Sequence, residues 1–166
     1  MLFQRRSGSK DTWPGALDVA VGGHLRAGET LAEAVREAEE EIGLALGLDD
    51  LTRLGRRFAR GTSGRDNEVQ EVFAVRSDLS LDAYLLHPDE VAAVVAVPLE
   101  DALALFEGQR EGVHGTELGR GERVPRSEHV AVSDFAAGEV GDYAVRALQG
   151  LLAVLGGGAP APFDLR

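Results

Sequence analysis

Cysteine is absent from this sequence of 166 residues. The absence excludes disulfide bonds, thiolate chemistry and zinc sites with cysteine ligands. Basic residues are scarce, with 17 lysines and arginines against 28 aspartates and glutamates and a net charge of -11. Such a surface repels duplex nucleic acid and anionic membranes, so we expect neither as a partner. There is no charged-then-apolar leader and no apolar run of membrane-spanning length, and we therefore expect a cytoplasmic protein.

The rest of the composition is that of a globular domain, with 44% hydrophobic and 27% charged residues. The length suits one domain, which we place at residues 1–156, followed by a disordered tail at 157–166. The negative charge does not exclude a small phosphorylated ligand, because metal ions and a few local arginines or lysines can reverse the field at one site.

Strand and helix patterns alternate along the chain, which predicts a sheet sandwiched between helices. Residues 109–128 are rich in glycine and charge and predict a long loop. The patterns predict strands at 1–6, 16–21, 51–60, 67–76 and 91–99, and helices at 30–42, 99–108 and 140–155.

The predicted helix at 30–42 has an apolar stripe on one side and clustered carboxylates on another. Glu37 lies four residues from both Glu33 and Glu41, and each such pair costs about 0.2–0.5 kcal/mol in an isolated helix. The cluster is either a solvated face of an acidic protein or a site for a hard divalent cation, which takes oxygen ligands.

The residues around the cluster favour its interpretation as a site for a divalent cation. Gly23, Glu29 and the segment "REAEEEIGL" at 36–44 resemble the Nudix box, a Gly, five residues, Glu, seven residues, then Arg-Glu-aliphatic-x-Glu-Glu-x-Gly-aliphatic. Six residues, one fewer than in the box, separate Glu29 from Arg36. We expect the start of the helix to absorb this deletion.

The resemblance implies a Nudix fold, an α/β/α sandwich with a mixed β-sheet. It also implies that Glu37, Glu40 and Glu41 hold Mg²⁺ or Mn²⁺ against a diphosphate. Gly23 and Glu29 would be structural positions of the motif, Arg36 would hold a carboxylate, and Gly43 would let the chain turn after the helix. The metal would polarise phosphorus and activate a water molecule for attack.

Two further segments look like the isopentenyl-diphosphate isomerase branch of the Nudix superfamily. The first, "QRRSGSKDTWPGALDVAVGGH" at 4–24, implies that Arg6 and Lys10 contact the substrate diphosphate. The second, "DNEVQEVFAVR" at 66–76, implies that Asp66 and Glu68 help to bind metal. His24, the last residue of the first segment, and Arg26, two residues after it, are candidates for contact with the substrate.

The isomerase reaction itself is not expected. In that branch a Cys precedes the Gly-His pair, whereas this chain has Gly22 there and no cysteine at all. We therefore predict hydrolysis of a diphosphate linkage in a small metabolite, such as a nucleoside di- or triphosphate or a nucleoside diphosphate derivative. The alternative is a Nudix-fold module that binds a nucleotide without turnover. The general base is left open among Glu40, Glu41 and Glu68, and the substrate is left open as well.

The start of the chain raises one more expectation. Related proteins usually have a strand before the segment that matches "LFQRR", and this sequence begins there. If that strand is lacking, the first strand exposes an edge that could pair with a second copy in a homodimer.

Overall fold

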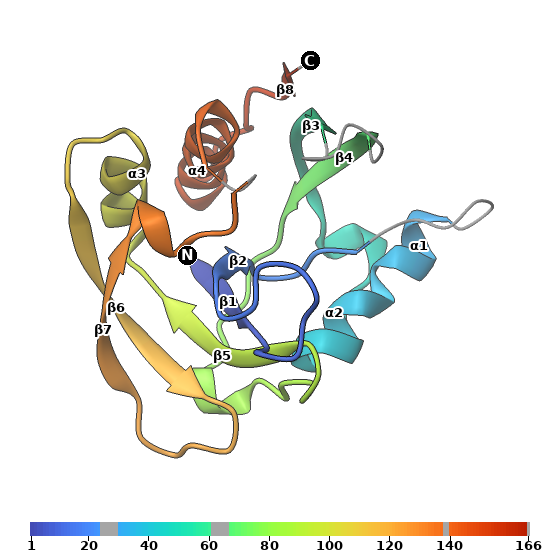
Figure 1. Cartoon of the computed structure of the whole chain (residues 1–166). Coiled ribbons are helices and arrows are strands. Elements are labelled where there is room, and N and C mark those ends of the chain that lie inside the picture. Colours follow the sequence, from blue (N-terminus) through green and yellow to red (C-terminus); the bar gives the residue numbers. More distant parts are fainter. Residues whose placement is uncertain (24–29, 61–66, 138–139, 166) are drawn as a thin grey trace.

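The computed structural model describes residues 1–23, 30–60, 67–137 and 140–165, with side chains at 60 and 67 left aside. Its strands form a five-stranded sheet in the order β2-β1-β5-β6-β7 and a three-stranded sheet in the order β4-β3-β8 (Figure 1). The strands are β1 Leu2–Arg6, β2 Leu17–Val19, β3 Thr52–Arg60, β4 Asn67–Ala74, β5 Val91–Ala96, β6 Gly112–Gly119, β7 Arg126–Ala131 and β8 Phe163–Leu165. The α-helices are α1 Leu31–Ala34, α2 Arg36–Ile42, α3 Leu99–Phe106 and α4 Asp142–Leu155, and short 3₁₀ helices are Leu48–Asp50, Leu81–Ala83 and Val132–Asp134.

Both directions of strand pairing occur. Neighbouring strands of the five-stranded sheet are antiparallel. In the second sheet, β3 is antiparallel to β4 and parallel to β8. A single parallel bridge also joins Leu17 to Phe135. These pairings confirm the predicted mixed sheet.

Helices cover both faces of the five-stranded sheet (Figure 1). Val95 of β5 packs with Leu105 of α3 and Leu148 of α4 on one face. Its neighbour Val94 points the other way and packs with Ile42 of α2. Burial on both faces explains why β5 is apolar throughout. The predicted α/β/α sandwich is confirmed.

The helix predicted at 30–42 is divided into α1 and α2, which meet at Val35. The N–H of Ala38 bonds to the carbonyl of Val35 at 3.1 Å, a tighter i→i−3 turn than the α-helical i→i−4. Thr30 and Glu33 form a capping box at the start of α1. The break at Val35 comes directly before Arg36, in the segment that is one residue shorter than the Nudix box.

The prediction of a long loop at 109–128 is wrong, because β6 and the start of β7 occupy most of this segment. Buried and exposed residues alternate through the first six residues of β6, as in a strand with one covered face. The pattern is hidden in the sequence because the buried positions are Val113, Gly115 and Glu117, only one of which has an apolar side chain.

The tail predicted to be disordered at 157–166 contains β8, which pairs with Gly55–Arg57 of β3. Gly55 makes this approach possible, since a Cβ there would lie 2.6 Å from Cγ of Phe163. The pairing partner is more than 100 residues away in sequence, so local composition gave no sign of the strand.

The exposed edge expected at the first strand is also absent. β1 lies inside the five-stranded sheet, with β2 on one side and β5 on the other. A homodimer through that edge is therefore not supported by the fold. Among the described residues, no helix is both long enough and apolar enough to cross a membrane.

Candidate active site

The most deeply placed acid of the predicted motif is Glu41 on α2. Only 7% of its surface is exposed, and its Oε2 accepts a hydrogen bond of 3.3 Å from Nε2 of Gln4, which is also buried. Burial raises the pKa of Glu41 to about 7. The nearby charges of Glu37 and Glu90 raise this pKa further, while the bond from Gln4 and the charge of Lys10 oppose the rise.

Glu37 lies against the chain that leads into the motif. A Cβ added to Gly23 would lie 2.7 Å from Cγ of Glu37, so a glycine is needed for this close approach. Arg36 is exposed, and its Nε donates to the carbonyl of Glu33 at 3.3 Å. Glu39 and Glu40 are exposed on the same helix. The motif thus presents one buried, one half-buried and two solvated carboxylates.

The end of α2 is fixed by Gly43, whose φ is +72°. The N–H of Gly43 bonds to the carbonyl of Glu39, and the N–H of Leu44 bonds back to Ala38, both at 3.0 Å. The carbonyl of Glu41 accepts a bond of 2.8 Å from the N–H of His87. The helix end is therefore anchored in the segment that precedes β5, as the predicted turn at Gly43 requires.

Gly43→Ala is expected to lower the free energy of unfolding by about 3 kcal/mol, because backbone strain adds to a collision with Leu85. The added Cβ would lie 2.6 Å from Cβ of Leu85 and 3.0 Å from its backbone nitrogen. Gly108→Ala is the matched control, because Gly108 has a φ of +73° but nothing within 4 Å of a Cβ. Urea denaturation should show that the control loses about 1 kcal/mol in free energy of unfolding. Equal losses in the two variants would show that the contact with Leu85 has no cost.

The two cations predicted to bind phosphate both have acidic partners in the structure. Lys10 forms an ion pair with Glu90, whose charge also acts on Glu41. Nη1 of Arg6 lies 2.8 Å from Oδ2 of Asp18, and its Nε donates to the carbonyl of Thr12 at 3.0 Å. Lys10 therefore lies close enough to the buried carboxylate of Glu41 for its charge to lower the pKa of that group, whereas Arg6 holds the loop that carries Lys10.

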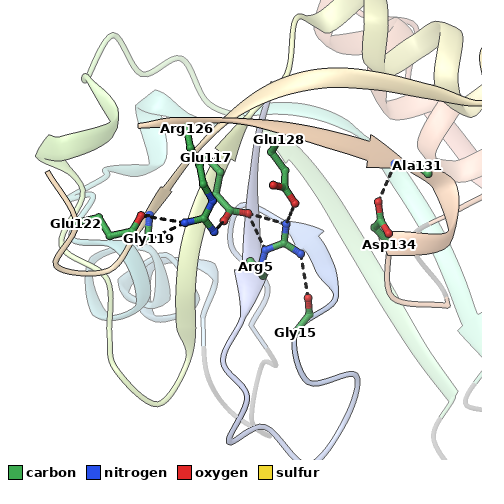
Figure 2. Close-up of polar contacts among 9 residues, drawn as sticks. All are labelled: Arg5, Gly15, Glu117, Gly119, Glu122, Arg126, Glu128, Ala131 and Asp134. Carbon is green, nitrogen blue, oxygen red and sulfur yellow. Dashed lines mark hydrogen bonds and ion pairs between the residues drawn. The ribbon is translucent and has the colours of Figure 1, made fainter. Parts of the chain in front are cut away.

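The far end of the same loop is held by a cluster of charges on β1, β6 and β7 (Figure 2). Nε of Arg5 lies 2.7 Å from Oε2 of Glu117, which is 0% exposed, and Nη1 of Arg5 donates to the carbonyl of Gly15 at 3.2 Å. Glu128 pairs with Arg5 at 2.9 Å, and Arg126 pairs with the other oxygen of Glu117. A carboxylate so deeply buried is stable only with such partners.

Glu68 lies on β4, away from the motif in sequence. Its Oε2 accepts a hydrogen bond of 3.1 Å from Nε2 of Gln70. Glu71 points to the other face of the hairpin, as its spacing from Glu68 predicts, and forms ion pairs with Arg53 and Arg56.

A model of the NUDIX domain matches residues 1–114, which include the whole motif. The chain belongs to the Nudix family. An uncharacterised Nudix hydrolase of Clostridium acetobutylicum is 26% identical over 150 residues, 87% of this chain and 73% of that protein. An uncharacterised Nudix hydrolase of Yersinia pestis is 52% identical over 107 residues, covering 63% of this chain and 54% of that protein.

The isopentenyl-diphosphate Delta-isomerase of Brevibacterium linens is 41% identical over 97 residues, 55% of this chain and 50% of that protein. The chain thus spans about half the length of the Yersinia and Brevibacterium relatives. Both resemblances found in the sequence, to Nudix proteins and to the isomerase branch, are confirmed. Relatives named as Nudix hydrolases support the prediction of an enzyme of this type.

The structure brings together only part of the predicted Nudix site. Around Glu41 lie Glu37 and Glu90, three carboxylates that interact electrostatically and are chemically suited to a hard divalent cation. Within the described ranges, however, no three aspartates, glutamates or histidines are arranged so that they could hold a metal ion. Four predicted site residues, His24, Arg26, Glu29 and Asp66, lie outside the described residues.

Sequence reasoning missed two neighbours of the Nudix carboxylates, Gln4 and Glu90. Gln4 is a polar residue in the middle of a strand between Phe3 and Arg5, and a polar side chain at an inward position of a central strand is a signal that could have been used. Glu90 lies directly before β5 and pairs with Lys10 across 80 residues of sequence, a contact that no local pattern announces.

Proposed function

We propose that the protein is a divalent-metal-dependent Nudix hydrolase that cleaves a diphosphate linkage in a small phosphorylated metabolite. The expected substrates are nucleoside di- and triphosphates and nucleoside diphosphate derivatives. The observation that carries the proposal is Glu41, buried on the motif helix among carboxylates that oppose its ionisation. A carboxylate in that position is costly unless a cation or a proton neutralises it.

In this proposal Glu37, Glu40 and Glu41 hold Mg²⁺ or Mn²⁺, and Asp66 and Glu68 assist them. The ion supplies the Lewis acidity that polarises a phosphoryl group and activates water. Gln4 fixes one oxygen of Glu41 through its hydrogen bond, which leaves the other for a ligand. The general base remains open among Glu40, Glu41 and Glu68.

The substrate diphosphate would be bound by side chains from the loop after β1. Lys10 forms an ion pair with Glu90, and its charge acts on Glu41. A phosphate group could take the place of the Glu90 carboxylate. Arg6 is proposed to contact phosphate as well, together with His24 and Arg26. A cationic group on a loop anchored at Gly15 by Arg5 suits a phosphate that must be held in a fixed orientation.

Isomerisation is not proposed, although one relative is named as an isomerase. Gly22 stands where that branch has its Cys, and this sequence contains no cysteine. The second candidate is a Nudix module that binds a nucleotide without turnover. The observations that favour it are the motif segment that is one residue short and the lack, within the described ranges, of a ready group of three metal ligands.

A substrate panel separates these functions. Phosphate and pyrophosphate release would be measured from nucleoside di- and triphosphates, nucleotide sugars and isopentenyl diphosphate, each with Mg²⁺, with Mn²⁺ and with a chelator. We expect turnover of at least one diphosphate with metal and none with the chelator. Tight nucleotide binding without any turnover would favour the binding module, and isomerised isopentenyl diphosphate would contradict the reasoning from Gly22. Cytoplasmic location stays a prediction.

A further inference from the structure

A series of contacts runs from Glu68 to the C-terminal strand. Glu68 and Gln70 lie two residues apart on β4 and therefore on one face of the hairpin. Arg57 lies directly opposite Gln70 on β3, and its Nε donates to Oε1 of Gln70. Nε2 of Gln70 then donates to Oε2 of Glu68 at 3.1 Å.

The direction of these bonds is dictated by Arg57. A guanidinium has only donors, so the oxygen of the Gln70 amide must face Arg57. The NH₂ group of Gln70 must then point toward Glu68. This direction suits Glu68, because an ionised carboxylate has only hydrogen-bond acceptors. Gln70 therefore holds Oε2 of the Glu68 carboxylate, and the orientation of the Gln70 amide is in turn set by Arg57.

Arg57 is itself held from the C-terminal side. Only 8% of its surface is exposed, and its Cζ lies 3.6 Å from the centroid of the Tyr143 ring on α4. The ring of Phe163 on β8 meets Tyr143 edge-to-face, with centroids 6.3 Å apart and planes at 71°. Leu165 of β8 pairs directly with Arg57, so β8 also supports the backbone at that position.

We propose that α4 and β8 position the carboxylate of Glu68 through Tyr143, Arg57 and Gln70. The inference rests on the proposed function, in which Glu68 helps to hold the metal. The three linking residues are positioning residues, because they act on Glu68 and not on the substrate. The C-terminal segment then contributes to the site although it lies outside the 114 residues that match the NUDIX domain.

Gln70→Leu tests the central contact, since leucine fills similar space but cannot bond to Glu68. We expect Mn²⁺ affinity, measured from the electron paramagnetic resonance signal of free Mn²⁺, to fall about 10-fold, as is typical when a partner of a metal ligand is lost. For a substrate that the wild type turns over, kcat should fall by a similar factor with KM nearly unchanged. Val69→Thr is the matched control, because Val69 is 61% exposed on the opposite face of the same strand.

Phe163→Ala tests the C-terminal end of the series of contacts and leaves the side chains of the β3–β4 hairpin unchanged. It therefore tests the positioning role even if Gln70→Leu does not fold. We expect Phe163→Ala to lower the Mn²⁺ affinity by a smaller factor, about threefold. Phe163→Tyr, which keeps the aromatic ring, should have the Mn²⁺ affinity of the wild type. Circular dichroism would verify folding of each variant. Unchanged Mn²⁺ affinity in the folded variants would overturn the positioning role.

These outcomes also separate this inference from the proposed function. A wild type that turns over substrate, with variants that keep its Mn²⁺ affinity and kcat, contradicts the inference alone. A wild type that binds Mn²⁺ without turnover, with variants that bind it more weakly, contradicts hydrolysis and supports the inference. A wild type that does not bind Mn²⁺ contradicts both.

Discussion

Glu41→Gln is expected to lower kcat at least about 100-fold on any diphosphate substrate of the wild type. Glutamine has nearly the same shape and can still accept the hydrogen bond from Gln4, so the helix should keep its position. It cannot, however, supply a negative charge to a cation or accept a proton. Steady-state kinetics over a range of Mg²⁺ concentrations would measure the loss and show whether added metal restores any activity.

The same substitution should make the metal-free protein more stable above neutral pH. The pKa of Glu41 rises on folding from its ordinary value of 4.5 to about 7. Between these values the unfolded chain loses its proton while the folded protein keeps it, so stability falls as pH rises. Above about pH 7 the full penalty applies, which corresponds to about 3 kcal/mol. Glutamine at this position carries no charge, so the variant should avoid most of this free-energy penalty.

Glu39→Gln is the matched control for both effects, because Glu39 lies on the same helix but is exposed. It should change neither kcat nor the pH dependence of stability measurably. Chemical denaturation at pH 5 and pH 8 in the presence of a chelator would give the stabilities. If Glu41→Gln retained full activity, the assignment of the metal site would be wrong. A stability of the wild type that did not fall between these pH values would contradict the raised pKa.

Arg5→Met is expected to lower the free energy of unfolding by about 3–5 kcal/mol, the usual cost of removing one partner of a buried ion pair. Glu117, which is 0% exposed in the wild type, would lose this partner and keep its ion pair with Arg126. The carbonyl of Gly15 and the carboxylate of Glu128 would lose a donor as well. Because Gly15 ends the loop that carries Lys10, KM for a diphosphate should also rise.

A double-mutant cycle shows whether the pairing itself is responsible. Arg5→Met combined with Glu117→Leu removes both charges of this ion pair, so the double variant should be considerably more stable than Arg5→Met alone. Arg110→Met is the surface control, since Arg110 pairs with Asp101 at 2.7 Å but is about half exposed. It should cost less than about 1 kcal/mol. Additive losses at Arg5 and Glu117 would show that the two side chains do not depend on each other.

Features that are local in sequence were predicted well. The apolar run of β5 and the spacing of apolar residues in α4 specify their elements without help from distant residues. The motif from Arg36 to Leu44 identified the family because its charges and glycines have fixed spacing. The Gly43 turn followed from the same pattern, since few residues other than glycine adopt a positive φ.

Features that depend on distant partners were not predicted. β6 has Gly115 and Glu117 at buried positions, and Glu117 is tolerated there because Arg5 and Arg126 form ion pairs with it. β8 exists because β3 offers an edge and Gly55 leaves room for Phe163. In the candidate site, Gln4 was missed for the same reason: its partner Glu41 is 37 residues away. Such pairs become visible only when the sheet is assembled.

Hydrolysis at phosphorus is tested most directly by phosphorus NMR of the wild-type protein with the nucleotide panel and Mg²⁺ in oxygen-18-labelled water. The proposal predicts that a diphosphate linkage is cleaved, that one phosphate product acquires the label, and that a chelator stops the reaction. Nucleotides that bind tightly but remain intact across the whole panel, with Mg²⁺ and with Mn²⁺, would contradict it.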